Sequence, residues 1–150
     1  MTFTRYAIYY APPAAADWSR FATNWLGWDM EAGAAAPHPD LAGLDVAQIT
    51  EVPRKYGLHA TTKPPLRLAE GQTQATLEEA CAALAARQQP VTLDGLQLAR
   101  LGRFLALRPV GNDTALNALA AACVQELDPF RAPAPEAELE RRRAAGLSPE

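Results

Sequence analysis

The sequence predicts an α+β fold in which short strands and amphipathic helices follow one another along 150 residues. Three observations lead to this fold class. Residues 5–10 are mostly aromatic or aliphatic, apolar residues recur at helical spacing in three later segments, and residues 91–109 alternate over enough length for two strands. The expected order is therefore strand, helix, strand, helix, strand, strand, helix.

The first strand and the first helix lie before a long connection. RYAIYY, residues 5–10, ends just before two prolines, as strands often do. Residues 27–54 are rich in Gly, Ala and Pro and predict an irregular connection with a helical turn near DVAQI. Between this strand and the connection, apolar residues recur at i, i+3, i+4 and i+7: Trp18, Phe21, Ala22 and Trp25. This spacing predicts a helix that ends near Gly27 and buries these four side chains in the core.

Two more helices flank the predicted pair of strands. GLHATTK predicts the second strand of the chain, with PPLRL as its extension or exit, and Thr73 is the expected N-cap of a helix that runs to about residue 88. Gly95 and Gly102 are candidate bulges or turns of the strands within 91–109, and a last helix is expected from about Asp113 to Leu127. The apolar stripes of the two helices are Leu77, Ala80, Cys81 and Leu84, and Leu116, Leu119, Ala120, Cys123 and Leu127.

The two cysteines each lie among apolar residues at helical spacing. This setting favours small buried apolar side chains over a disulfide or a metal pair.

The end of the chain differs in composition from the rest. We expect an incomplete α+β domain over residues 1–130, followed over 131–150 by a Pro-rich linker and a charged helix. Two interpretations of Arg141, Arg142 and Arg143 stay open: a solvated helix face, which we favour, or a phosphate-binding role.

Composition excludes several classes of partner. A net charge of −3 argues against long nucleic acid and anionic membrane surfaces, while 49% apolar and 21% charged residues are ordinary for a soluble globular protein. The N-terminus has no signal-peptide pattern, and no apolar segment approaches the ~20 residues that span a bilayer. We therefore expect a cytoplasmic protein; its oligomeric state is left open.

The stretch RKYGLHATTK contains the candidate catalytic and phosphate-binding residues. Side chains alternate along a strand, so His59, Thr61 and Lys63 are expected on one face. An imidazole can transfer a proton, and a hydroxyl can donate a hydrogen bond to a phosphoryl oxygen. An ammonium can neutralise the negative charge of the phosphate group. A small phosphorylated molecule is the partner that this set favours, although a single His-x-Thr is a weak signal.

Five separated blocks of the chain resemble a known family. RYAIYYAPP, WLGWD, PRKYGLHATTKPP, LARLGRFLALRP and LDPFRAPAPEAELERRRAAGLSPE together resemble an uncharacterised family that is often encoded among phosphonate-utilisation genes. That family belongs to the two-histidine phosphoesterase superfamily, which includes RNA-ligase-like proteins and cyclic nucleotide phosphodiesterases. The resemblance implies two lobes, each a small antiparallel sheet backed by helices, with one His-x-Thr from each lobe facing a cleft. It implies no metal and no other cofactor.

The resemblance assigns roles to residues of this stretch. His59 becomes a catalytic acid or base and Thr61 holds a phosphoryl oxygen, while Lys63, Arg54 and Tyr56 are candidate substrate-binding residues.

Two features depart from the superfamily pattern. The other histidine, His38, lies in PHPDL without a threonine, so a second His-x-Thr is expected beyond Glu150 and the chain is expected to be truncated and inactive alone. Thr62 stands where an apolar residue is usual, so we expect looser packing behind the motif.

Three functions are weighed. The first is a metal-independent phosphoesterase acting on a cyclic phosphodiester, with a sugar cyclic phosphate of phosphonate metabolism as the suggested substrate. The second is a non-catalytic module that binds a phosphorylated sugar or a phosphonate intermediate. The third and least favoured is a metal-dependent hydrolase using His38, Asp40 and His59.

Overall fold

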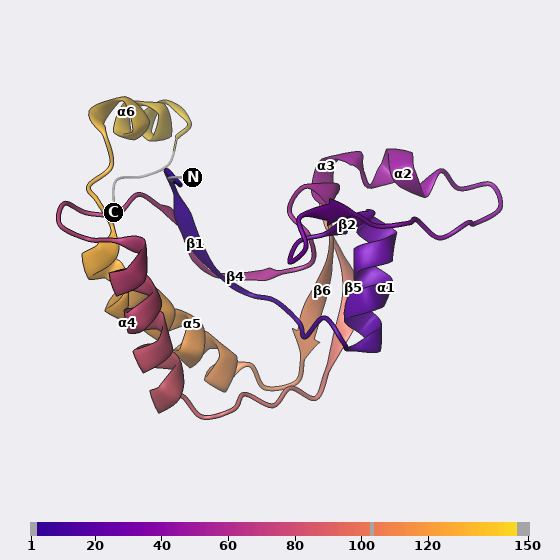
Figure 1. Ribbon diagram of the computed structural model, residues 1–150, viewed down its shortest axis with the longest axis horizontal. Coiled ribbons are helices and arrows are strands. Elements are labelled where there is room, and N and C mark those ends of the chain that lie inside the picture. The colour runs from indigo at the N-terminus through magenta and orange to yellow at the C-terminus, as the bar shows by residue number, and fades with distance from the viewer. Residues whose placement is uncertain (1–2, 103, 147–150) are drawn as a thin grey trace. The chain divides into compact units, whose positions relative to one another are not determined.

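The computed structural model describes residues 3–102 and 104–146, and it confirms the α+β fold class (Figure 1). The last four residues of the predicted tail, 147–150, lie outside the described part. The elements in chain order are β1 (Tyr6–Tyr10), α1 (Asp17–Leu26), β2 (Trp28–Asp29), β3 (Ala34–Ala35), α2 (Val46–Ile49), α3 (Glu51–Arg54), β4 (Ala60–Leu66), α4 (Gln74–Arg87), β5 (Gly95–Leu101), β6 (Phe104–Val110), α5 (Thr114–Glu126), the 3₁₀ helix η1 (Asp128–Phe130) and α6 (Glu136–Ala144).

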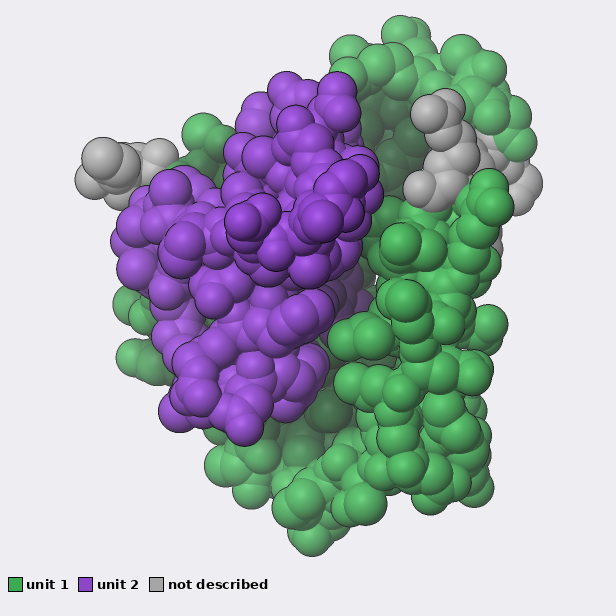
Figure 2. All heavy atoms as spheres, turned by 90° about the vertical axis from the view of Figure 1, so that its right-hand side faces the viewer, with its two compact units in different colours: residues 1–8, 62–150 green, residues 9–61 purple. Residues whose placement is uncertain are grey.

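The chain divides into two compact units, which Figure 2 distinguishes by colour. Unit 1 comprises residues 1–8 and 62–150, and unit 2 comprises residues 9–61. Residues 131–146 belong to unit 1 together with the two long helices. The boundary expected after residue 130 stays a prediction.

Helices α4 and α5 form the core of unit 1. Their buried residues are the ones that helical spacing predicts, and Tyr6 and Ile8 of β1 pack against them. Thr73 caps α4 as expected: its hydroxyl accepts a hydrogen bond from the backbone N–H of Thr76, and the Thr76 hydroxyl accepts one from the backbone N–H of Thr73. The buried cluster consists of Leu77, Leu84, Cys123 and Leu127.

Both cysteines are free thiols that pack in this core, as predicted. Burial raises the pKa of the Cys81 thiol, and Cys123 and Glu78 nearby raise it further. A thiol in this setting stays protonated and is unreactive.

The strands form small separate sheets. β5 and β6 make an antiparallel hairpin that pairs Gly95 with Val110 and Leu101 with Phe104. Gly102 forms the turn at a φ of 61°, as predicted, whereas Gly95 pairs in regular register. The strands β1 and β4 pair in a second sheet, and β2 and β3 in a third. Because β4 pairs with β1 alone in the described part of the chain, its two consecutive prolines are tolerated.

Unit 2 contains α1, the β2–β3 pair and the two short helices. The helical turn predicted at DVAQI is α2, which Asp45 caps by accepting a hydrogen bond from Gln48 N at 3.0 Å. The expectation that the tryptophan-rich stripe of α1 is core was wrong for two of its members: Trp18 is 40% exposed and Phe21 is 63% exposed. Ser19 is the buried residue of α1, so the helix packs through a different side.

Among the described residues, the longest helices are too short or too polar to cross a membrane.

Candidate functional site

His59 lies between the end of α3 and the start of β4, and its own loop fixes the imidazole. The ring Nδ1 is 3.2 Å from the carbonyl oxygen of Gly57, two residues earlier. When Nδ1 carries the proton, it donates to this carbonyl and leaves the lone pair on Nε2. The half-buried ring therefore presents one nitrogen that is able to accept a proton.

A tyrosine of β1 supports the ring from one side. The Tyr9 and His59 rings stack with centroids 3.9 Å apart and an interplanar angle of 24°. The electron-rich face of a phenol favours a cationic partner, so Tyr9 would stabilise an imidazolium formed by proton uptake. Tyr9 is not predicted by the sequence, because the aromatic and aliphatic composition of residues 5–10 indicates a strand but not which residues that strand contacts.

Gly57 is the residue that permits this loop. It has a φ of 65°, which a residue with a side chain rarely adopts, and a Cβ there would lie 2.9 Å from Cβ and Sδ of Met30. A glycine is therefore required both by the backbone conformation and by close packing.

Thr61 is the second residue of β4 and is exposed, so its hydroxyl is accessible. The neighbouring Thr62 turns to the paired strand, and its hydroxyl donates to the carbonyl oxygen of Ile8 at 2.9 Å. The polar residue that departs from the superfamily pattern is thus hydrogen-bonded. His59 itself precedes the strand by one residue, so strand alternation does not fix its direction.

Lys63 is buried, whereas the sequence predicts a cation that is accessible to a ligand. It is 2% exposed, and its Nζ donates to the carbonyl oxygen of Val124 at 2.7 Å and lies 3.4 Å from Oδ1 of Asp128. An ammonium has three donors, and α5 and η1 engage two of them. Its predicted substrate contact stays a prediction, whereas its described contacts give it a packing role in unit 1.

The other two candidate binding residues differ in exposure. Tyr56 is 62% exposed. The Arg54 guanidinium donates to the carbonyl oxygen of Ala47 and lies 3.5 Å from Oγ1 of Thr50, which ties α3 to α2. Its buried Nε has no hydrogen-bond partner among the described residues.

His38 is held inside unit 2 by backbone groups. Its Nδ1 is 3.1 Å from the carbonyl oxygen of Trp25, and its ring lies so close to Gly27 that a Cβ there would be 2.3 Å from two ring atoms. Within residues 3–102 and 104–146, no group of three or more potential metal ligands is found, so His38, Asp40 and His59 do not gather.

Asp128 connects Lys63 to a surface arginine. Nε and Nη2 of Arg131 donate to the two carboxylate oxygens at 2.7 and 3.0 Å. The hydrogen bond from Arg131 is the largest cause that lowers the pKa of Asp128 to about 2; partial desolvation opposes it, and Lys63 adds to the lowering. The carboxylate thus stays ionised at every physiological pH.

Comparison with known proteins places the chain in a family. Residues 61–150 match the family described as "Protein of unknown function (DUF1045)". The chain belongs to this family. The matched region begins at Thr61, so His59 lies just ahead of it.

Two curated relatives carry the same name, "Ribose 1,5-bisphosphate phosphokinase PhnN". The protein from Janthinobacterium sp. (strain Marseille) is 35% identical over 150 residues, which cover 98% of this chain and 33% of the relative. The protein from Laribacter hongkongensis (strain HLHK9) is 36% identical over 146 residues, which cover 92% of this chain and 35% of the relative. The chain thus spans about a third of the length of these relatives. No solved structure matches it.

We predict that Gly57→Ala destabilises unit 2 more than Gly33→Ala does. Both glycines have positive φ, but a Cβ at Gly33 meets nothing within 4 Å. The backbone conformation should cost each variant about 1–2 kcal/mol, and the clash with Met30 should cost Gly57→Ala about 1–3 kcal/mol more. Urea unfolding measures both losses, and equal losses would contradict the packing argument.

We also predict a pH-dependent contribution from Asp128. Its pKa in the folded protein is about 2, below the ordinary 3.8, so its stabilising effect is complete above about pH 4 and disappears as the pH falls toward 2. Asp128→Asn should therefore be less stable than wild type at pH 6, and the difference should shrink at pH 2.5. A difference that is constant between these pH values in urea unfolding would contradict the assignment.

Proposed function

We propose that this chain supplies one acid/base group and one phosphoryl-binding hydroxyl to a metal-independent phosphoesterase that acts on a cyclic phosphodiester. The observation that carries the proposal is the anchoring of His59, whose Nδ1 lies 3.2 Å from the carbonyl oxygen of Gly57. Because a carbonyl oxygen only accepts, this contact favours the tautomer with the proton on Nδ1 and the lone pair on Nε2. The exposed hydroxyl of Thr61, two residues on, supports it. Membership of the two-histidine superfamily is part of the proposal.

The reaction requires two proton transfers. A water oxygen attacks phosphorus and gives its proton to a base, and the ring P–O bond breaks as the leaving oxygen takes a proton from an acid. His59 fills one of these roles, and Tyr9 stabilises the ring when it is protonated. The other role belongs to a second His-x-Thr, which the family resemblance implies outside these 150 residues.

The names of the relatives support one substrate class. Both are named for ribose 1,5-bisphosphate, which supports a phosphorylated ribose as the molecule recognised here. The gene neighbourhood of the resembling family suggests that such a sugar arises in phosphonate metabolism. The kinase activity in the relatives' name is not carried over, because the match covers about a third of their length.

A non-catalytic module is the second candidate. It is favoured by the relatives' name, since a segment related to sugar bisphosphate kinases can bind the sugar phosphate without performing chemistry on it. The exposed Thr61 and Tyr56 would then contact the ligand.

The test compares His59→Gln with the matched control His38→Gln, which changes the other histidine of the chain. Hydrolysis of a ribose cyclic phosphate is measured with the protein as it occurs in the cell, including any sequence outside these residues. We expect His59→Gln to lower kcat by about 10²–10⁴-fold, because an acid/base group is lost. His38 is engaged by Trp25 and Gly27, so His38→Gln should keep a kcat close to that of wild type.

The outcomes separate the two candidates. Turnover by wild type that His59→Gln retains would contradict the phosphoesterase proposal. Binding of the cyclic phosphate without turnover, weakened by His59→Gln, would favour the non-catalytic module.

A further inference from the structure

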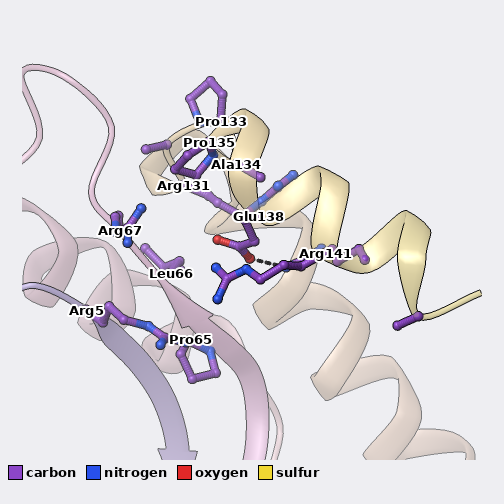
Figure 3. A pocket seen from close by; sticks show the side chains of 13 residues that line it. Arg5, Pro65, Leu66, Arg67, Arg131, Pro133, Ala134, Pro135, Glu138 and Arg141 are labelled. Atoms are coloured by element: carbon purple, nitrogen blue, oxygen red, sulfur yellow. Dashed lines mark hydrogen bonds and ion pairs between the residues drawn. The ribbon is translucent and has the colours of Figure 1, made fainter. Parts of the chain in front are cut away.

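A groove in unit 1 gathers arginines from distant parts of the sequence. It has a cavity volume of about 410 Å³ and is lined by the start of β1, the end of β4, residues 131–135 and α6. Figure 3 shows Arg5 and Arg67 beside the strands and Arg141 on α6. The charged residues that line it are Arg5, Arg67, Arg131, Glu138, Arg141 and Arg142.

Backbone hydrogen bonds hold two walls of the groove together. Ala132 N donates to the carbonyl oxygen of Arg67 at 2.8 Å, and Ala69 N donates to that of Phe130 at 2.9 Å. Leu68 and Arg131 form a β-bridge between these bonds. The backbone segments that carry Arg67 and Arg131 are thus paired, so these two walls of the groove do not depend on the chance position of surface loops.

Carboxylates balance only part of the charge. Arg131 pairs with Asp128, and Arg142 pairs with Glu138 at 2.6 Å. In the described part of the chain, Arg5, Arg67 and Arg141 make no ion pair with a carboxylate. Three of the five arginines that line the groove are thus not paired with a carboxylate of the described residues, in a chain whose net charge is −3. Like charges that converge in this way repel one another unless an anion lies between them.

We propose that this groove is a binding site for the phosphate groups of a small phosphorylated molecule, with Arg5, Arg67 and Arg141 as its ligands. The planar guanidinium fork matches a phosphate and binds two of its oxygens at once. The volume of about 410 Å³ lies within the range of small-molecule sites. The net negative charge of the chain disfavours a long polyanion such as RNA.

The site lies wholly within unit 1, and neither His59 nor Thr61 lines it. In the arginine run of α6, Arg141 lines the groove, which supports a phosphate-binding role for it, whereas Arg143 pairs with Glu136 at 2.8 Å. The proposal does not depend on the phosphoesterase activity, because its measurement is binding and not turnover.

The experiment measures binding of inorganic pyrophosphate and of ribose 5-phosphate by isothermal titration calorimetry at constant ionic strength. The test variant is Arg67→Gln combined with Arg141→Gln, and the matched control is Arg100→Gln, which removes an exposed arginine of β5 that does not line the groove. We expect the double variant to weaken pyrophosphate binding by at least about tenfold, since two charge-assisted hydrogen-bonding groups are lost. The control should bind as wild type does.

A variant that should bind pyrophosphate more tightly than wild type provides a second test. Glu138→Gln removes the lining carboxylate and releases Arg142, so it should tighten pyrophosphate binding severalfold. Thermal unfolding verifies that each variant is folded.

Four results would overturn the proposal: pyrophosphate binding by the double variant equal to wild type, an equal loss in Arg100→Gln, weaker binding by Glu138→Gln, or binding of a single-stranded oligonucleotide without binding of pyrophosphate. Tighter binding of ribose 5-phosphate than of pyrophosphate, with the same dependence on Arg67 and Arg141, would support a sugar phosphate as the occupant.

Discussion

The buried ammonium of Lys63 is the interaction on which the arrangement of unit 1 depends. Its Nζ donates to the carbonyl oxygen of Val124 in the last turn of α5, where the unpaired carbonyls of a helix carry partial negative charge. A cation with 2% exposure is costly to remove from water unless such partners receive it. The strand β4 is therefore held to α5 at one defined position.

The residues at the two ends of β4 belong to the two proposed sites. Thr61 is the second residue of the strand and lies two residues after His59, whereas Arg67 comes directly after the last residue of β4 and lines the groove. Asp128 extends the same network outward, because it lies beside Lys63 and accepts two hydrogen bonds from Arg131. Along the sequence, residues 59–67 thus contain the proposed acid/base group, the buried cation of unit 1 and one arginine of the proposed phosphate-binding groove.

Local signals in the sequence predict much of the fold. Thr73 indicates the start of α4 because its hydroxyl can accept from the first turn, and Gly102 indicates a turn because the hairpin there requires a positive φ. The face of α1 could not be predicted in the same way. Helical spacing shows that Trp18 and Phe21 share a side of the helix, but it does not say whether another element covers that side.

The candidate site is predictable only in part, for the same reason. The His-x-Thr pattern identifies His59 and Thr61, but alternation along β4 does not reveal that Lys63 would be buried against α5, 61 residues later in the chain. The stacking of Tyr9 on His59 joins residues 50 positions apart and leaves no local pattern. The groove is lined by Arg5, Arg67 and Arg141, which lie far apart in the sequence, so no local pattern predicts that they line one groove.

Nuclear magnetic resonance of the imidazole nitrogens can establish whether His59 contacts the phosphodiester. ¹⁵N-labelled protein is titrated with a ribose cyclic phosphate while the ring nitrogens of both histidines are observed. We expect Nδ1 of His59 to carry the proton in the free protein, and the His59 Nε2 resonance to shift as ligand binds, while the His38 resonances stay in place. A shift confined to His38, or saturable binding that leaves both rings unchanged, would contradict it.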